Sequence, residues 1–285
     1  MANCLVTGHR GYIGSTLYWR LVSMGHNVVG IDYKDNSEWD ILNGLEKLEQ
    51  YDFDYVFHLA CIPRVAYSVE QPIHTMMNNV LSTSIMLDFA KRKNVKRFIY
   101  SGSSSVVGNG DGPASPYALQ KLTSELETKL YSDLYDLDTV TLRYFNVYSF
   151  DQKADSPYAT AVANWMRYIR EGKNPFITGN GKQRRDMAHK SDVVSANIFA
   201  MEYEGAFNGR HYDVGTGSNI SLNEMKDIVN EYFPDVQFDY VEKRKGDVLF
   251  TKANMSPLKK LGFEPKINVK EGISNCFKQL KEKLQ

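Results

Sequence analysis

The sequence has few cysteines and no excess of charge. Three cysteines, Cys4, Cys61 and Cys276, are scattered through 285 residues, a spacing that fits neither a disulfide framework nor a zinc site. We therefore expect reduced thiols, as in the cytoplasm, and no metal. The 34 basic and 34 acidic side chains give a net charge of zero, so no overall positive field is available to hold nucleic acid or an anionic membrane. Any phosphate must be bound by local groups.

Long apolar runs are also missing. No stretch of about 18 apolar residues could span a membrane. The opening residues, MANCLVTG, run directly into an apolar segment, so we expect no signal peptide. The composition, with 42% hydrophobic and 24% charged residues, is typical of a globular protein. The length allows one large domain, or one domain with a smaller lobe.

The first half of the chain alternates between apolar strands and amphipathic helices. The predicted strands are NCLVTG, HNVVGID, YDFDYVFHLA, VKRFIYSGS and LDTVTLRYF. Helices are predicted between them, including two long ones at about 73–93 and 116–136. Apolar strands separated by helices favour a parallel sheet that is covered on both faces. Right-handed crossovers then give a doubly wound, Rossmann-type α/β fold.

The second half changes character after Tyr148. We expect residues 1–149 to form a dinucleotide-binding Rossmann domain, to which the chain returns at about 186–217 through the strand HYDVGTG. Residues 150–185 and 218–285 are predicted to form a smaller, C-terminal lobe that binds the substrate.

A glycine-rich loop joins the first strand to the first helix. In TGHRGYIGS, Gly8 can make the turn, Gly11 can let the backbone approach a pyrophosphate, and Gly14 can let helix and strand pack closely. The helix start supplies N–H donors and a partial positive charge. The spacing is one residue longer than G-x-G-x-x-G, and a tight strand–helix turn without a ligand would also explain it.

An acidic residue at the end of the second strand favours a dinucleotide. Asp32 lies where a carboxylate accepts hydrogen bonds from the adenosine ribose, and it would repel a 2′-phosphate, which favours NAD over NADP. Arg10 in the loop and Lys34 beyond Asp32 could both meet a phosphate, so NADP stays an alternative. Asp40 and Ile41 could flank the adenine.

A tyrosine and a lysine share one face of a predicted helix. Ser115 fits an N-cap and Pro116 the first helical position, so Tyr117 and Lys121 lie side by side at i and i+4. The free phenol pKa is about 10. A neighbouring ammonium lowers it, an oxidised nicotinamide would lower it further, and the pair becomes an acid/base near neutrality. A chance YxxxK on an amphipathic helix is the alternative.

The strand FIYSGSSSVVG decides between these interpretations. Its hydroxyl cluster lies at the carboxyl edge of the predicted sheet, where open α/β sheets bind ligands. A serine there can hydrogen-bond the substrate oxygen that Tyr117 protonates. Together these features predict a site for hydride transfer.

These segments resemble, in their order, the extended short-chain dehydrogenase/reductase family, and within it the NAD-dependent nucleotide-sugar epimerases and dehydratases. The resemblance covers nearly the whole chain and includes TGHRGYIGS, VFHLA, SGSSSVVG, SPYALQK, RYFNVYS, GNGKQRRD, SDVVSAN, DVGTG and RKGD. It implies NAD as cofactor and a nucleotide sugar, with a UDP-sugar favoured, as substrate. It also implies a homodimer in which the two long helices pair with their copies as a four-helix bundle.

The resemblance assigns roles to individual residues. Ser103, Tyr117 and Lys121 fall on the catalytic hydroxyl residue, tyrosine and lysine of the family. The implied cofactor contacts, besides Tyr117 and Lys121, are Gly8, Arg10, Gly11, Tyr12, Ile13, Gly14, Asp32, Asp40, Ile41, Leu59 and Ala60. The implied substrate contacts are Arg64, Ser103, Ser104, Ser105, Tyr117, Asn146, Arg185, Arg244 and Thr251. Of these, Asn146 would contact the diphosphate, and the two later arginines the nucleotide phosphates or ribose.

Departures from the family pattern narrow the activity. Its dehydratases and decarboxylases carry an acid beside the catalytic hydroxyl, where this chain has Ser104 and Ser105. We therefore expect C4 epimerisation of a UDP-hexose or UDP-N-acetylhexosamine through a transient 4-keto intermediate. Thr251 is small where a large residue would exclude an N-acetyl group. The usual Gly-Pro-Arg after RYFNVY is Ser149-Phe150-Asp151, which leaves the shape of the sugar pocket open.

Two other functions remain as alternatives. GHRG and WDILN resemble a branch of reductases, so the chain could be an NAD(P)H-dependent nucleotide-sugar reductase or epimerase/reductase. It could also be a non-catalytic NAD-binding regulator that has kept the fold.

Overall fold

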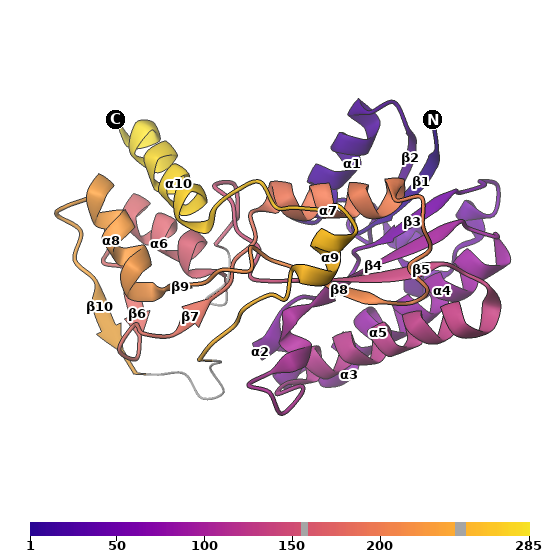
Figure 1. Ribbon diagram of the computed structural model, residues 1–285, viewed down its shortest axis with the longest axis horizontal. Coiled ribbons are helices and arrows are strands. Elements are labelled where there is room, and N and C mark those ends of the chain that lie inside the picture. Colours follow the sequence, from indigo (N-terminus) through magenta and orange to yellow (C-terminus); the bar gives the residue numbers. More distant parts are fainter. Residues whose placement is uncertain (155–158, 243–248) are drawn as a thin grey trace. The chain divides into compact units, whose positions relative to one another are not determined.

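The computed structural model describes residues 1–154, 159–242 and 249–285 (Figure 1). The chain forms two compact units. The first comprises Met1–Arg143 and Val194–Tyr212, and the second Tyr144–Val193 and Asp213–Gln285. The functional division expected from the sequence, with a cofactor domain of residues 1–149 and 186–217, stays a prediction.

A six-stranded sheet forms the centre of the first unit. Its strands are β1 (Asn3–Thr7), β2 (Asn27–Ile31), β3 (Tyr55–His58), β4 (Arg97–Ser103), β5 (Thr139–Tyr144) and β8 (His211–Val214). Their order is β2-β1-β3-β4-β5-β8, and β1 is parallel to both β2 and β3, as β3 is to β4. The direction of winding reverses between β1 and β3, which is where doubly wound sheets bind ligands.

Helices cover both faces of this sheet. Figure 1 shows α1 (Gly14–Ser23) and the Val194–Glu202 part of α7 (Lys190–Glu202) on one face, and α4 (Ser82–Arg92) and α5 (Pro116–Tyr135) on the other. The sheet strands are apolar because both faces are covered: Leu5, Val56 and Phe98 are fully buried. The predicted doubly wound α/β fold is confirmed.

The segment between β2 and β3 contains no further strand. The classic Rossmann order places another strand outside the second one, but residues 32–54, all described, form only three 3-10 turns. These are η1 (Ser37–Trp39), η2 (Ile41–Asn43) and η3 (Glu46–Leu48). This short connection leaves β2 as an edge strand, so the acidic residues that follow β2 lie at the edge of the sheet.

The helix predicted at about 73–93 is interrupted. It consists of α3 (Pro72–Met76), a π-helical turn η4 (Met77–Leu81) and α4. The turn buries Asn79, whose side-chain oxygen accepts from the Ile62 N–H at 2.7 Å and whose amide donates to Gln120 Oε1 at 2.9 Å. A buried amide needs such partners, and π-turns commonly occur at functional sites. Here the turn ties the loop after β3 to helix α5.

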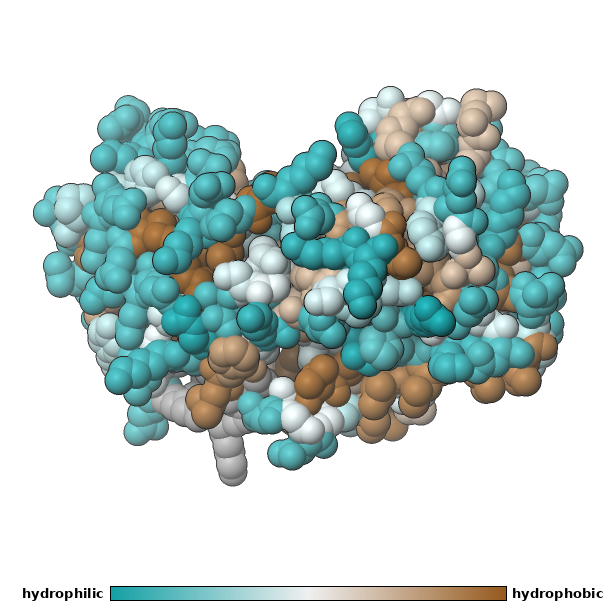
Figure 2. Space-filling model, in the orientation of Figure 1, coloured by the Kyte–Doolittle hydropathy of each residue, from teal (hydrophilic) through white to brown (hydrophobic). Residues whose placement is uncertain are grey.

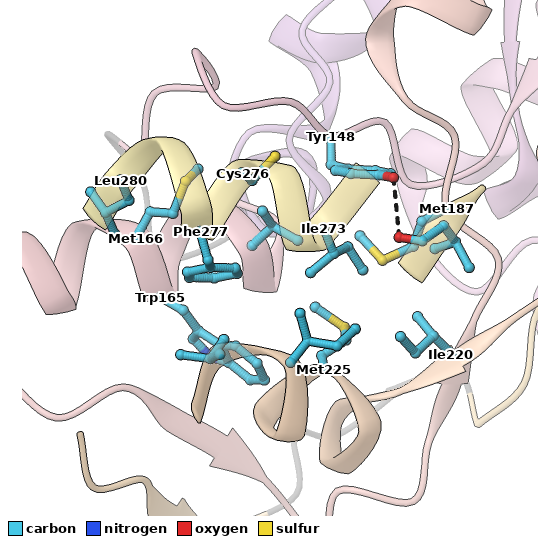
Figure 3. Close-up of a cluster of buried hydrophobic side chains, with 14 of the residues drawn as sticks. Tyr148, Trp165, Met166, Met187, Ile220, Met225, Ile273, Cys276, Phe277 and Leu280 are labelled. Carbon is cyan, nitrogen blue, oxygen red and sulfur yellow. Dashed lines mark hydrogen bonds between the residues drawn. The ribbon is translucent and has the colours of Figure 1, made fainter. Parts of the chain in front are cut away.

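The second unit is built around its own hydrophobic core (Figure 3). Its elements are α6 (Ala161–Arg170), β6 (Phe176–Thr178), β7 (Arg184–Arg185), β9 (Ile220–Ser221), α8 (Leu222–Tyr232), β10 (Asp239–Val241), α9 (Ser256–Lys260) and α10 (Val269–Leu284). β6 pairs in parallel with β10, and β7 antiparallel with β9. Figure 3 shows Trp165 and Phe277 in this core and the Tyr148 hydroxyl, which donates to the Val269 carbonyl at 3.4 Å.

Among the described residues, no helix combines the length and the apolar character that crossing a membrane requires.

Candidate active site

The glycine loop has the shape of a phosphate cradle. Gly8 has a φ of +70°, and a Cβ there would lie 2.8 Å from the Ala60 backbone nitrogen. A Cβ on Gly14 would lie 2.2 Å from the Gly8 carbonyl oxygen, which also accepts from the Gly11 N–H at 2.8 Å. Glycine is required at these two positions because no side chain fits. The loop therefore places bare backbone where β1 and β3 diverge.

Within the described part of the chain, the start of α1 has no side-chain cap on its N-cap residue. Tyr12 and Ile13 lead into the helix, and no side chain of the described residues forms a cap on Ile13. Uncapped N–H groups and the helix dipole favour an anion. The loop and the helix start together fit the pyrophosphate of a dinucleotide.

Asp32 lies beyond this cradle and is only 7% exposed. Its carboxylate accepts hydrogen bonds from the backbone N–H groups of Arg10 at 3.1 Å and Lys34 at 3.0 Å. The Arg10 guanidinium is paired with Asp35. Each Asp32 oxygen retains acceptor capacity, so the carboxylate fits a ribose diol.

The other residues that are expected to contact the cofactor lie after β3 and at η2. Leu59 and Ala60 follow β3, and their N–H groups donate to Thr7 Oγ1 at 3.2 and 3.1 Å. The carboxylate of Asp40 accepts from the Leu42 N–H and so caps η2. The side chain of Ile41 is buried in the core cluster around Leu5, where it helps to fix the position of η2.

A series of hydrogen-bonded side chains, which sequence reasoning did not identify, lies beneath the glycine loop and supports it. Thr7 Oγ1 accepts two N–H groups, so its own hydrogen points to His58 Nδ1 at 2.8 Å. Burial, followed by the positive charge of Lys121, lowers the pKa of His58 to about 3. The neutral ring therefore carries its proton on Nε2, which donates to Thr83 Oγ1 at 3.1 Å.

The start of α5 is built as predicted. Ser115 Oγ accepts from the Ala118 N–H at 3.2 Å, and Pro116 occupies the first helical turn. The N–H of Tyr117, which has no partner within the helix, donates to Ser68 Oγ at 3.0 Å. Ser68 belongs to α2 (Val65–Glu70), so this short helix holds the first turn of α5 in place.

Lys121 is almost completely buried, with 3% exposure. Its ammonium donates to the Ser101 carbonyl at 2.7 Å and lies 4.9 Å from the centre of the Tyr100 ring. Burial lowers the pKa of Lys121, but the neighbouring groups of Cys61, Tyr100 and Tyr117 raise it by more, and the net shift is upward. The amine is therefore a fixed positive charge beneath the site at neutral pH.

Tyr117 differs from the sequence expectation in its acidity. Burial raises its pKa to about 12, while the charge of Lys121 and a hydrogen bond with Ser103 lower it by less. The ammonium alone does not bring the pKa of Tyr117 down to near 7, because the phenol is removed from water. An additional positive charge close to Tyr117 would lower the pKa further.

The hydroxyl cluster follows the end of β4. Ser103 Oγ accepts from the Ser105 N–H at 3.2 Å and lies 2.9 Å from Ser105 Oγ. Ser104 begins the 3-10 turn η5 (Ser104–Val107). Of the three predicted catalytic residues, Ser103 and Lys121 both lie close enough to Tyr117 to act on its ionisation. Arg64 is exposed at the start of α2.

The second unit gathers three predicted substrate residues around Asp186. The carbonyl oxygen of Asp186 accepts from Asn146 Nδ2 at 2.8 Å, and its N–H donates to Thr251 Oγ1 at 3.0 Å. Arg185 precedes it in β7. Asn146 has a φ of +32°, a conformation in which asparagine is enriched.

The Asp186 carboxylate joins three chain segments. It accepts from the N–H groups of Thr216, Gly217 and Ala253 at 2.8–2.9 Å, and from the Thr216 hydroxyl. Burial raises the pKa of Asp186, although these hydrogen bonds oppose the shift. Sequence reasoning missed this residue, whose only signal was its place after two arginines in GNGKQRRD.

Two further features of this unit bear on the predicted site. Asp151, which stands where the family pattern has an arginine, pairs with the buried ammonium of Lys190. Arg244 lies outside the described residues. Within the described ranges, no group of three histidine, cysteine or acidic side chains could hold a metal ion.

Comparison with known proteins gives consistent matches. Residues 4–215 match the family described as the NAD dependent epimerase/dehydratase family. A curated relative, the putative UDP-glucose 4-epimerase of Methanocaldococcus jannaschii, is 27% identical, with 97% of this chain and 98% of the relative covered.

Two solved structures are also similar over nearly their full length. The UDP-N-acetylglucosamine 4-epimerase of Methanobrevibacter ruminantium, in complex with UDP-N-acetylmuramic acid, is 30% identical, has a TM-score of 0.89, and is covered over 99% of both chains. The UDP-glucuronic acid 4-epimerase of Bacillus cereus, in complex with UDP-glucuronic acid and NAD, is 25% identical, with a TM-score of 0.87 and coverage of 99% of this chain and 100% of that one.

Proposed function

Because the chain belongs to the NAD-dependent epimerase/dehydratase family, we propose that it is an NAD-dependent nucleotide-sugar epimerase. Its reaction is inversion at C4 of a UDP-hexose or UDP-N-acetylhexosamine through a transient 4-keto sugar. The 4-epimerase names of the similar proteins support this activity.

The observation that carries the proposal is the grouping around Tyr117. Its phenol has the Ser103 hydroxyl and the Lys121 ammonium as neighbours that favour its ionised form. The three side chains come from the end of β4 and the first turns of α5. The glycine cradle and Asp32 in the same unit fit NAD.

The residues divide the chemistry between them. A bound nicotinamide supplies the acceptor and donor of the hydride. Tyr117 removes the proton of the C4 hydroxyl and later returns it, and Ser103 donates a hydrogen bond to the same oxygen. Lys121 stabilises the phenolate by its charge and, by resemblance, holds the nicotinamide ribose.

The neighbours of Ser103 favour epimerisation over elimination. Ser104 and Ser105 offer hydroxyls where a dehydratase or decarboxylase of the family has a carboxylate. Without a carboxyl group as proton donor at this place, the 4-keto sugar is expected to lose neither water nor carbon dioxide. It is expected to take the hydride back on its other face.

We further propose that the second unit holds the nucleotide. Asn146 would contact the diphosphate, Arg185 and Arg244 the phosphates or ribose, and Thr251 the C2 substituent of the sugar. The Asp186 hydrogen bonds support this role, because they fix the backbone beside Asn146 and Thr251. Arg64, exposed on the first unit, is a further candidate for the sugar.

A homodimer through α5 and the α3–α4 segment is also proposed. The buried face of α5 carries polar residues: Gln120, Lys121, Ser124, Glu125 and Thr128. Its exposed side carries leucines: Leu119, Leu126, Leu130 and Leu134. Figure 2 shows apolar side chains along the lower edge of the first unit, over α3 and α5, and exposed apolar patches of this kind mark interaction sites. A cytoplasmic location stays a prediction from the sequence.

The test is incubation of the purified protein with UDP-, GDP- and dTDP-sugars, followed by product analysis. The expected product is the C4 epimer of a UDP-sugar, formed without net change in nicotinamide absorbance. Stoichiometric loss of reduced cofactor would instead support the reductase, and a stable 4-keto-6-deoxy product would overturn the epimerase. Tight NAD binding without any turnover would support the regulator.

A further inference from the structure

Two carboxylates, and not one, follow strand β2 at the ribose side of the cradle. Asp32 accepts the N–H groups of Arg10 and Lys34. Asp35, three residues later and half-buried, holds the Arg10 guanidinium in an ion pair and lies 3.6 Å from His9 Nε2. The glycine loop and the acidic turn after β2 are therefore linked by two consecutive loop residues.

The packing beneath this pair fixes its position. The His9 ring lies against Gly30 of β2, where an added Cβ would come within 2.5 Å of the ring. The turn after β2 is closed by a 2.9 Å hydrogen bond from the Asp35 N–H to the Asp32 carbonyl. Glycine at position 30 leaves room for His9, and the turn brings Asp35 up to the loop.

Arg10 is the cation in this region best suited to a phosphate. Its backbone N–H already contacts the Asp32 carboxylate, which is the group expected to meet the ribose hydroxyls. A planar guanidinium forms strong, charge-assisted hydrogen bonds with phosphate. The pair with Asp35 engages this guanidinium and leaves a second negative charge beside it.

We propose that Asp35 is a determinant of NAD over NADP, in addition to Asp32. A 2′-phosphate would have to take Arg10 from Asp35 and would then lie near two carboxylates. A 2′-hydroxyl meets no such cost. The inference concerns only the adenosine half of the cofactor, so it does not depend on which sugar the protein converts.

The charge arrangement predicts what removal of Asp35 does. Asp35→Asn keeps the size of the side chain, removes one negative charge and releases Arg10 for a phosphate. Because the Arg10 partner of Asp35 is 55% exposed, and ion pairs with such solvent access contribute at most about 1 kcal/mol to stability, the variant is expected to fold. Asp35→Ser is a second, smaller substitution for the same measurement.

The experiment measures binding of adenosine 2′,5′-bisphosphate and of 5′-AMP to the full chain by calorimetry. In Asp35→Asn, the affinity for the bisphosphate relative to 5′-AMP is expected to rise at least about tenfold. The affinity for NADPH relative to NADH is expected to rise by a similar factor. Adding Arg10→Ala to Asp35→Asn should reduce the gain, because only the relief from the Asp35 charge then remains.

A matched control separates local from general charge. Glu171→Gln breaks an exposed ion pair with Lys173 in the second unit and changes the net charge equally, so it should leave the ratio unchanged. An unchanged ratio in both Asp35 variants would overturn the proposal. So would a gain that is undiminished without Arg10, or an equal gain in the Glu171 control.

Discussion

The Lys121 ammonium donates a 2.7 Å hydrogen bond to the carbonyl oxygen of Ser101. This contact joins helix α5 to strand β4 two residues before Ser103, and so sets the distance between the strand that carries the hydroxyl and the helix that carries Tyr117. Lys121 thus acts on the candidate site through its position as well as through its charge.

Replacing Tyr117 by phenylalanine tests its proton transfer. Tyr117→Phe should retain the fold and the bound cofactor but lower the rate of epimerisation by roughly 10²–10⁴, the usual contribution of general acid–base catalysis. Turnover is measured by product analysis, and NAD content by release from denatured protein. Tyr51→Phe, on an exposed tyrosine, is the control and should be fully active. Near-normal turnover of Tyr117→Phe would contradict the assignment.

The charge of Lys121 should be visible in the pH dependence. Burial holds the Tyr117 pKa at about 12 in the protein alone, and Lys121 opposes this shift. The phenolate is the base, so kcat/KM should rise with pH up to the pKa of Tyr117 in the NAD-loaded protein without sugar. Lys121→Met removes the opposing charge, raises that pKa and should move the rising limb of kcat/KM to higher pH. Lys121→Arg keeps the charge and should move it less. Identical profiles for all three proteins would argue against an electrostatic role.

The size of residue 251 should select the sugar. In Thr251→Tyr, turnover of a UDP-N-acetylhexosamine should fall by more than turnover of the plain hexose, because the larger side chain occupies the place of the acetamido group. A small group of this kind is worth about 1–3 kcal/mol. Thr251 Oγ1 also accepts from the Asp186 N–H, so Thr251→Val, which loses that bond at nearly constant size, is the matched control. Equal losses on both sugars would remove Thr251 from the pocket.

The leucines of α5 should determine the oligomeric state. Leu130→Glu places a charge in the proposed interface, and burying an unpaired charge is unfavourable. The variant should be monomeric by light scattering at micromolar concentration, whereas the unmodified chain should be a dimer. Val22→Glu places the same charge on the exposed apolar part of α1 and should remain dimeric. A monomeric unmodified chain would reject the interface.

The capping box of α8 gives a prediction for stability against pH. Partial burial raises the pKa of Glu224, but the hydrogen bonds from Ser221 and the Arg184 ion pair outweigh it and bring the pKa down to about 2. A carboxyl with a depressed folded-state pKa stabilises fully above its ordinary value, here 4.5, and loses this contribution as the pH falls toward 2.

Glu224→Gln should therefore lower Tm at pH 7 by a small amount, because glutamine can keep the capping hydrogen bonds and only the charge is lost, an effect of at most about 1 kcal/mol for a partly exposed ion pair. The difference from the unmodified chain should shrink between pH 4.5 and 2. Glu231→Gln, exposed on the same helix, should leave Tm unchanged. A difference that stays constant over this pH range would show that the carboxylate charge is not involved.

Much of the fold could be read from local sequence. Apolar strands alternating with helices predicted the doubly wound sheet, and Ser115 with Pro116 predicted where α5 begins. The order of the motifs also identified the family. These features depend on neighbouring residues, through backbone geometry, side-chain periodicity and capping, and local sequence determines all three.

Local sequence did not predict the interruption of the long helix at Asn79. That π-turn arises from partners on two other segments, the loop at Ile62 and Gln120 of α5. An asparagine in a helix gives only a weak local signal. The π-turn is fixed by the cost of burying an amide without hydrogen bonds, and this cost arises only once those segments meet.

What the sequence by itself determined was which groups the protein has for its chemistry: a glycine loop, an acid after β2, and a serine, tyrosine and lysine at family spacing. The tertiary structure decided how these groups behave. Burial raises the pKa of Tyr117 against the effect of Lys121, Asp35 engages Arg10 across two turns, and Asp186 joins segments 30 to 67 residues away. Desolvation and long-range pairing depend on which segments the folded chain brings together, and no local pattern contains that information.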